Sequence, residues 1–290
     1  MSSPRIALAV FVAILVACAA SRAATTAPCT FQTFNPPAGY TLSTVDAIGD
    51  DGTVVGQVTN NTTLVNEGFV RSPKGRFTIY AAPDSTVTWM YGHNGTQTSV
   101  GSYIDNGATS TVHGFSLVGT TFTALNYPSA SNTWLFDVNK TGSAVGSYSS
   151  GSYVYGFLLV DDKYTNVSYP KAVSTYPIGL SDKGSVVGTY SSGEISNGFL
   201  WQNGKYTTIN YPKAPFGTAL DGINNDGVIV GNRLLAESSA GFIYEKGVFE
   251  DIVYTGAKFT LVGGINNNGV ISGQIYLTET KSIGYTATCK

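Results

Sequence analysis

One spaced pattern occurs six times along the 290-residue chain, and it limits the possible folds more than any other feature. Each copy contains a glycine that follows a serine or threonine by 13 residues. Steps of 45, 45, 42, 43 and 42 residues separate these glycines, which are Gly56, Gly101, Gly146, Gly188, Gly231 and Gly273. The hydroxyl residues are Ser43, Thr88, Thr133, Thr175, Thr218 and Thr260. Repeats of about 40–45 residues are typical of the blades of a β-propeller.

The fifth copy shows what each repeat contains. Strand patterns cover 220–224, 228–231, 241–244 and 249–254, with glycine-containing turns at Asn225-Asp226-Gly227 and Lys246-Gly247. Each pattern mixes β-branched and aromatic residues, as strands do, and glycine suits the positive φ of tight turns. The sequence therefore predicts an all-β fold, a six-bladed β-propeller of four-stranded blades.

The two ends of the chain complement each other. Each fourth-strand pattern begins with an aromatic residue, and one more such residue, Phe31, stands six residues before Pro37 near the N-terminus. The last repeat stops after its third strand pattern, at 284–288. We therefore expect the N-terminal strand to complete the last blade, which closes the ring and leaves no free edge.

Two of the three cysteines flank the repeats. By comparison with the fourth copy, Cys29 and Cys289 occupy the places of Gly204 and Asn203, which are adjacent turn residues. We expect a Cys29–Cys289 disulfide at this interrupted hairpin, since an exported protein allows the pair to oxidise. Two unrelated free thiols are the alternative.

Residues 1–23 resemble a targeting segment that precedes a single domain, 24–290. Arg5 is followed by an apolar run of 11 residues, 6–16, which is too short to span a bilayer. Ser21-Arg22-Ala23 offers a signal-peptide cleavage site. In a second interpretation, Leu15-Val16-Ala17-Cys18 is a bacterial lipobox, and lipidation of Cys18 anchors the protein at the cell envelope. No later stretch predicts a transmembrane segment.

Charge and composition exclude some classes of partner. Without Arg5 and Arg22 the chain carries 14 basic and 18 acidic side chains, a net charge of −4. There is no basic cluster, so we expect no nucleic-acid partner. Only 12% of the residues are charged, and apolar residues recur through every repeat, which argues against disorder.

Several motifs resemble those of a known family. Residues 222–231 read Gly-Ile-Asn-Asn-Asp-Gly-Val-Ile-Val-Gly, 264–269 read Gly-Ile-Asn-Asn-Asn-Gly, and His113-Gly114-Phe115 precedes an aromatic strand pattern. These motifs resemble the extracellular HAF-repeat proteins over 31–288. The resemblance implies an exported repeat protein and supplies no catalytic residue. The position of His113 is Glu67, Tyr155, Asn197, Ala240 or Ile283 elsewhere, so a histidine is dispensable there.

The sequence gives little support to catalysis. His93 and His113 are the only histidines, and no catalytic triad or zinc spacing can be assembled from them. Asp50-Asp51-Gly52 and 224–227 lack the ligand alternation of a calcium loop, so we interpret them as turns. No catalytic residue, metal or cofactor is therefore assigned.

Three polar residues keep two interpretations each. Asp46 and Asp221 share a first-strand position, where polar lining of the channel and a glycosidase-type pair are both possible. His93 stands in an otherwise aliphatic column, which favours a hydrogen-bonded core histidine over a functional one.

The best binding signal is aromatic. The residue after each repeated hydroxyl is Thr44, Trp89, Trp134, Tyr176, Ala219 or Leu261, so only three neighbouring blades carry a large ring there. Together with residues two positions further on, the predicted ligand-binding set is Trp89, Trp134, Tyr176, Tyr91 and Phe136. Packing between blades is the alternative role for these rings.

Long, variable connections between second and third strands gather on one face, where binding loops belong. They are predicted at 59–66, 104–112, 149–153, 191–196, 232–239 and 276–282. The leading hypothesis is a secreted, monomeric, non-catalytic propeller that binds an extracellular glycan or protein ligand on this loop-rich face. The alternatives are a glycan-cleaving hydrolase or lyase, and a cell-surface protein-interaction module.

Overall fold

The computed structural model describes residues 25–107, 109–236 and 238–290, and the described chain is all-β. The predicted targeting segment 1–23, with its alternative lipobox at Cys18, lies outside these residues. Within them, nothing forms a helix that could cross a membrane.

The strands form successive antiparallel groups. The first is β3 (Tyr40–Ile48), β4 (Val54–Asn60), β5 (Asn66–Arg71) and β6 (Phe77–Tyr80). The second is β7 (Ser85–His93), β8 (Thr98–Asp105), β9 (Val112–Val118) and β10 (Thr121–Ala124). The third is β11 (Thr133–Val138), β12 (Ala144–Ser150), β13 (Tyr153–Val160) and β14 (Lys163–Asn166).

Two further groups continue the series. They are β15 (Ser174–Leu180), β16 (Val186–Ser191), β17 (Ser196–Gln202) and β18 (Lys205–Thr208), then β19 (Gly217–Ile223), β20 (Ile229–Leu234), β21 (Ser239–Glu245) and β22 (Val248–Asp251). Single parallel pairs, Val154 with Ser174 and Ser196 with Gly217, join the third, fourth and fifth groups into one continuous sheet.

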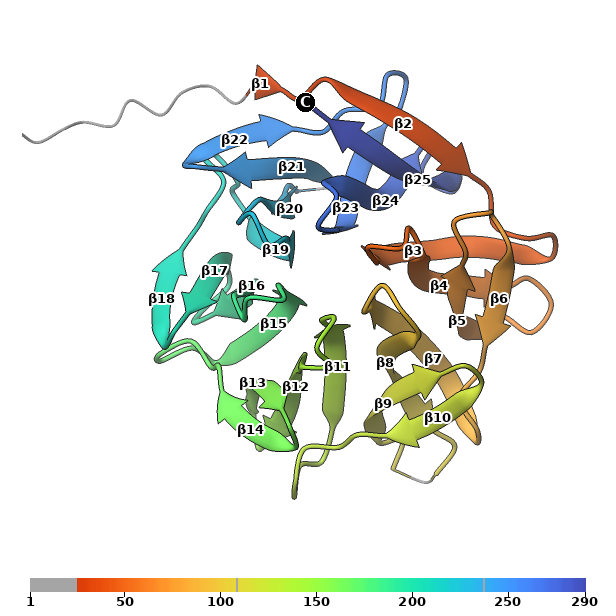
Figure 1. The fold of residues 1–290 in the computed structure, drawn as a ribbon, viewed down its shortest axis with the longest axis vertical. Helices are drawn as coiled ribbons and strands as arrows, with labels where there is room; N and C mark the ends of the chain where they lie inside the picture. The colour runs from red at the N-terminus through yellow and green to blue at the C-terminus, as the bar shows by residue number, and fades with distance from the viewer. Residues whose placement is uncertain (1–24, 108, 237) are drawn as a thin grey trace, which may run out of the picture.

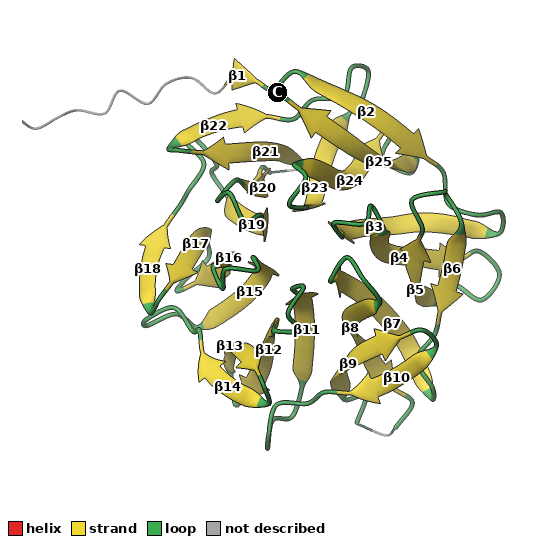
Figure 2. Ribbon diagram, in the orientation of Figure 1, coloured by secondary structure: helices red, strands yellow, loops and turns green. Residues whose placement is uncertain are grey.

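The groups are arranged radially, with the first strand of each nearest the centre (Figure 1). Each innermost strand contacts the next one along the chain, and β23 (Phe259–Ile265) contacts β3. Figure 2 shows strands joined only by loops and turns. This is the arrangement of a β-propeller, so the predicted fold class is confirmed at that level.

The N-terminal strand β2 (Cys29–Phe34) joins the end of the chain. It pairs with β25 (Ser282–Cys289), which pairs with β24 (Val270–Tyr276) and through it with β23. Cys29 lies opposite Cys289, and their sulfur atoms are bonded at 1.98 Å. The predicted pairing of these two cysteines is therefore confirmed.

The repeated hydroxyls hold the segments that lead into the first strands. Five of them accept a hydrogen bond of 2.8–3.0 Å from a backbone N–H: Thr88 from Ala82, Thr133 from Tyr127, Thr175 from Tyr169, Thr218 from Tyr211 and Thr260 from Tyr254. All five threonines are buried. A buried N–H without a partner is costly, so these positions require a hydroxyl.

The repeated glycines are required because a carbonyl oxygen approaches each of them closely. A Cβ atom placed on any of the six would lie 1.9–2.3 Å from a first-strand carbonyl oxygen, such as that of Trp134 for Gly146. The cause is a β-bulge in each first strand opposite the glycine, which bends the strand toward its neighbour.

The structure corrects two details. The predicted connections between second and third strands lie where expected, but they are too long by one to three residues at each end because the strands extend into them: β12 ends at Ser150 and β13 begins at Tyr153. The fourth strand of the fifth group ends at Asp251, not at Tyr254. In addition, β1 (Thr25–Thr26) pairs in parallel with β22, which no sequence pattern predicted.

Candidate functional site

A single position in each first strand lines a cavity on the central axis. This residue occupies the bulge and stands three residues after the repeated hydroxyl: Asp46, Tyr91, Phe136, Ile178, Asp221 and Gly263. All six line the cavity, whose volume is about 210 Å³. The bulge therefore has two effects: it fixes the glycine opposite, and it places one side chain per group at the axis.

The cavity wall has two chemically different halves. Around the axis the fifth group, the β23–β24–β25–β2 sheet and the first group supply Asp221, Gly263 and Asp46, so two carboxyls flank a position without a side chain. The second, third and fourth groups supply Tyr91, Phe136 and Ile178 on the other half. Gln57, Asn232 and Gln274 come from the second strands, and Asn232 and Gln274 join the lining on the acidic half.

Each acidic residue is held by one of its oxygens. Oδ2 of Asp46 accepts hydrogen bonds from the Thr44 hydroxyl at 2.6 Å and the Gln57 amide at 3.2 Å. Oδ2 of Asp221 accepts one from the Asn232 amide at 2.7 Å. The pKa of each carboxyl is raised from 3.8 to about 7, mainly by burial. The charge of Asp221 contributes to the raised pKa of Asp46. The two groups therefore interact electrostatically.

In a third carboxyl at the cavity, that of Asp137, both oxygens accept hydrogen bonds from backbone N–H groups. It accepts hydrogen bonds from the N–H groups of Val138 at 2.8 Å and Leu180 at 2.9 Å. Burial nevertheless raises its pKa to about 7. Its hydrogen bonds connect the neighbouring first strands β11 and β15, so this carboxylate stabilises the fold.

Aromatic rings form a chain along the opposite half of the wall. Trp89 stacks on Tyr91 with centroids 6.5 Å apart, Tyr91 lies 5.5 Å from Phe136, and Phe136 lies 6.3 Å from Tyr176. Burial raises the pKa of Tyr91, and the charge of Asp46 contributes to this. The two halves of the wall are therefore in electrostatic contact.

The structure brings four of the five predicted ligand-binding residues together. Tyr91 and Phe136 line the cavity, while Trp89 and Tyr176 extend the ring chain at either end. Trp134 is half-buried, and in the described chain it pairs with no aromatic ring and does not line the cavity. Its role in the set stays a prediction, as does ligand binding by the others.

One sequence signal could have identified the whole cavity wall. The position three residues after the repeated hydroxyl varies from carboxyl to ring to glycine. The predicted binding set included Tyr91 and Phe136 from this position, and Asp46 and Asp221 were noted there, but the set was centred on the position two residues earlier, that of Trp89, Trp134 and Tyr176. Sequence reasoning missed the bulge, which turns this third residue toward the axis.

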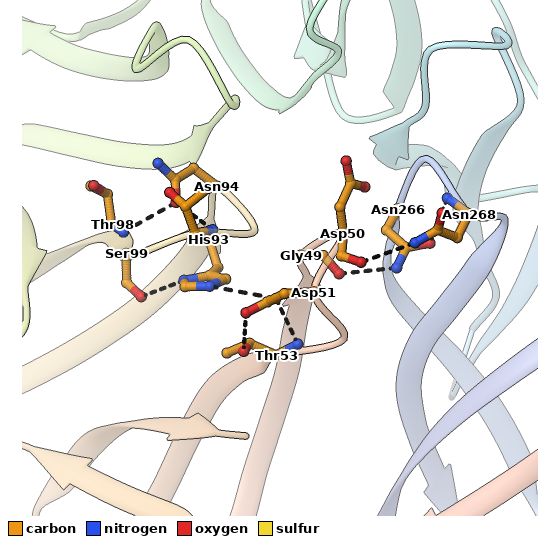
Figure 3. Close-up of polar contacts among 11 residues, drawn as sticks. Gly49, Asp50, Asp51, Thr53, His93, Asn94, Thr98, Ser99, Asn266 and Asn268 are labelled. Atoms are coloured by element: carbon orange, nitrogen blue, oxygen red, sulfur yellow. Dashed lines mark hydrogen bonds and ion pairs between the residues drawn. The ribbon is translucent and has the colours of Figure 1, made fainter. Parts of the chain in front are cut away.

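Polar turns span the end of the cavity between first and second strands. Asn267 donates to Asp50 and to Asp182, both at 2.9 Å, and Asn225 donates to Asp182 at 2.8 Å. Figure 3 shows neighbouring contacts at this end, where the Asn266 amide reaches the carbonyl oxygen of Gly49. These contacts connect the turns of several groups and narrow the cavity at this end.

Both histidines have structural partners. His93 is buried, with Nδ1 3.0 Å from the Ser99 hydroxyl and Nε2 3.8 Å from Asp51, and burial lowers its pKa (Figure 3). The Asp51 carboxylate also accepts from Thr53, as expected of a turn. His113 bridges Asp105 and Asn126 at 3.1 and 3.0 Å, away from the cavity.

In the part of the chain that the structure describes, no three histidine, cysteine or acidic side chains are grouped to hold a metal ion. Five carboxyls line the cavity, but those of Asp137, Asp50 and Asp182 are bonded within the protein, so the groups left to meet a ligand are the carboxyls of Asp46 and Asp221 and the neighbouring side-chain amides. They can accept or donate hydrogen bonds and offer negative charge.

No family model and no curated protein match this sequence. Among solved structures, the chain is similar to AofleA from Arthrobotrys oligospora, with a TM-score of 0.60 and 11% identity over 89% of this chain and 86% of that one. A gluconolactonase of Xanthomonas campestris gives a TM-score of 0.53 at 10% identity, covering 93% and 98%. The calcium-binding protein regucalcin of Agrobacterium tumefaciens gives 0.50 at 14% identity, covering 88% and 95%. At these identities the likeness shows the propeller-type fold alone.

Proposed function

We propose that the protein is an exported, non-catalytic binding propeller that holds a sugar-sized part of an extracellular glycan in its axial cavity. The observation that carries the proposal is the two-sided wall, with rings on one half and carboxyls and amides on the other. A sugar presents apolar C–H faces and hydroxyl edges, so this wall complements both. The cavity volume, about 210 Å³, is below the roughly 300–1,000 Å³ of drug-sized sites and suits one sugar ring.

We infer six blades, with β2 closing the last one. The pairing of β2 with β25 and the contact of β23 with β3 support this. A ring closed by strand pairing and a disulfide is a rigid support, and rigid support lowers the entropic cost of binding. Export is supported by the Cys29–Cys289 disulfide, since such bonds persist in oxidising compartments. We further propose membership of the HAF-repeat family on the motifs given above.

The ligand would approach from the loop-rich face. At the opposite end the turns are bonded to one another across the cavity, because the Asn267 amide donates to the carboxylates of both Asp50 and Asp182. On the loop-rich side, Trp89 and Tyr176 adjoin the rings that line the cavity. We therefore assign Tyr91 and Phe136 to the inner contact, with Trp89 and Tyr176 at its margins.

A glycan array with the purified protein tests the proposal, followed by calorimetric titration of any bound glycan against two variants. Phe136→Ala should weaken binding about tenfold, because a lost ring contact is worth about 1–1.5 kcal/mol. Trp134→Ala tests the remaining member of the predicted set: its ring is on the same strand but does not line the cavity, so affinity that persists in this variant would assign the contact to Phe136 and not to Trp134. Melting curves exclude unfolding of either variant. Absence of any glycan ligand, or unchanged affinity in Phe136→Ala, would refute the proposal.

A glycan-cleaving enzyme is the second candidate, and the carboxyl pair favours it. Glycosidases use one protonated and one ionised carboxyl, and Asp46 and Asp221 both have a pKa of about 7. The same array ligand, incubated with the protein and analysed for shortened products, decides between binding and cleavage. Product formation that Asp46→Asn abolishes would replace the binding proposal.

Exposed apolar side chains favour a protein-interaction role as a third candidate. Tyr153, Val173, Ile195 and Phe216 are about half exposed on the loop-rich face. Tyr153 begins β13, and the other three lie in connections. Strand pairs link their neighbours, Val154 with Ser174 and Ser196 with Gly217, so the four follow adjacent groups. Concentration-dependent association in sedimentation experiments, lost in Phe216→Ser, would support this candidate.

A further inference from the structure

The acidic half of the cavity wall has negative charge without a partner. Each of Asp46 and Asp221 uses Oδ2 for all its hydrogen bonds to the described protein, and Oδ1 of each has no donor there. Neither Oδ1 is among the enclosed unpaired atoms of the described residues, so both remain open to the cavity. These two oxygens are therefore free to meet a ligand.

No basic side chain offsets this charge. The ion pairs within the described residues involve neither Asp46 nor Asp221. Lys140 is the one lysine or arginine among the described residues that line the cavity, and it belongs to the narrowed end, where its backbone N–H binds Asp182. The two aspartates thus flank the Gly263 position and interact electrostatically, with no lysine or arginine of the described cavity lining bonded to either of them.

The space between the two carboxyls is maintained by the backbone. Gly263 cannot carry a side chain, because a Cβ atom there would lie 1.9 Å from the carbonyl oxygen of Val45. The opposite half presents Tyr91 and Phe136, whose centroids are 5.5 Å apart. Aromatic faces attract cations through their quadrupole. The gap, the two free oxygens and the rings are three separate features that suit one chemical group.

We propose that the ligand of this cavity carries a cationic nitrogen, a primary ammonium, which binds between Asp46 and Asp221 while its carbon skeleton lies against Tyr91 and Phe136. The inference rests on the proposed binding function and adds the ligand's chemical class. A charged donor bound to an ionised carboxylate makes a stronger hydrogen bond than a hydroxyl does. An amine-bearing sugar therefore binds in preference to the neutral sugar of the same shape.

A matched pair of probes tests this inference. 6-Amino-6-deoxyglucose and glucose share one ring and differ in a single ammonium or hydroxyl group. Calorimetry or ligand-observed NMR at pH 8, where the two carboxyls are ionised, should show the amino sugar binding at least tenfold more tightly. In Asp46→Asn and in Asp221→Asn the difference should fall to about twofold or less. Asp226→Asn, at an exposed turn residue, is the control and should retain the full preference.

The outcomes separate this inference from the proposed function. Equal affinities, or tighter binding of glucose, would overturn the cationic ligand and leave a neutral sugar-binding cavity. Binding of neither probe would overturn the cationic ligand, while the glycan array decides the proposed function separately. A preference that persists in both aspartate variants would mean that the ammonium binds elsewhere, which also overturns the inference. Melting curves show whether each variant is folded, and the amide oxygen of asparagine can still accept the bonds of Thr44 and Asn232.

Discussion

The repeated hydroxyls and glycines, here called the framework, and the six bulge residues of the cavity wall include residues of the same first strands. The framework residues are nearly the same in every repeat, whereas the wall residues differ from repeat to repeat. In the framework, one buried threonine and one glycine recur at fixed places, and each has a backbone contact that only its residue type allows. In the wall, the bulge residue changes from Asp46 to Phe136 to Gly263 without altering the bulge.

The difference has a physical cause. A framework residue meets backbone groups of the repeat: the glycine meets a first-strand carbonyl oxygen in all six copies, and the hydroxyl meets a backbone N–H in five, while Ser43 pairs with the Thr59 hydroxyl. A wall residue meets the cavity, where its neighbours are the wall residues of the other groups. Its type is therefore free to follow a ligand. In a repeat protein, the position that breaks the repeat while keeping the backbone geometry is the better candidate for function.

The framework should fail most severely where the ring is joined. Deleting 25–34 removes β1 and β2, which leaves the edge of β25 unpaired. We expect loss of cooperative unfolding or association through the open edge, detected by far-UV circular dichroism melts and size-exclusion chromatography. The Cys29→Ser/Cys289→Ser variant separates the two contributions, since it loses only the disulfide, worth at most about 5 kcal/mol. A truncated protein that melts like the parent would contradict closure by β2.

Replacing a framework glycine should cost more than replacing a turn glycine. In Gly146→Ala the new Cβ would lie 2.1 Å from the Trp134 carbonyl oxygen, so backbone must move, and we expect at least about 3 kcal/mol of destabilisation. Gly142→Ala is the control: it has a φ of +86° and open space around it. Its cost should be about 1–2 kcal/mol, from backbone conformation alone. Urea unfolding measures the loss of stability in both variants. Equal losses would mean that the close carbonyl oxygen is not the reason for the repeated glycine.

Removing a framework hydroxyl should have a moderate effect. Thr133→Val keeps the shape of the side chain and leaves the Tyr127 N–H without its 2.9 Å acceptor. We expect a loss of about 1–3 kcal/mol in the free energy of unfolding. Thr133→Ser keeps the hydroxyl and should cost less than Thr133→Val. If the two variants unfold at the same urea concentration, the hydroxyl is not the reason for the repeated threonine.

The sequence predicted the framework well because its causes are local and repeated. The offset between Thr133 and Gly146 recurs six times, and so reveals strand length, turn and blade together. The interrupted hairpin even placed Cys29 beside Cys289. The wall was predicted only in part. Whether Trp134 or Phe136 reaches the axis depends on the bulge, which reverses the side-chain alternation expected of a regular strand. Likewise, β1 depends on an edge supplied 225 residues away, as the Thr25–Glu250 contact shows.

The wall should also affect the dependence of stability on pH. The carboxyls of Asp46 and Asp221 have a pKa of about 7 in the folded protein, against an ordinary value of 3.8. Between pH 4 and 7 the folded state keeps protons that the unfolded chain has released. Stability should therefore fall as the pH rises through this window and level off above about 7.

The slope is at most about 1.4 kcal/mol per pH unit for each carboxyl, and less in practice because the cavity admits water. The groups that face Asp46 are Thr44, Gln57, Tyr91 and Asp221, none of them a cation. The double variant Asp46→Asn/Asp221→Asn should flatten the slope without removing it, since Asp137 keeps a pKa of about 7.

Urea titrations at half-unit steps from pH 4.5 to 8 measure the free energy of unfolding against pH, with Asp226→Asn as the control. An unchanged slope in the double variant would mean that both aspartates are already ionised in the folded protein. The wall would then carry a permanent negative charge, and the difference between wall and framework would rest on shape alone.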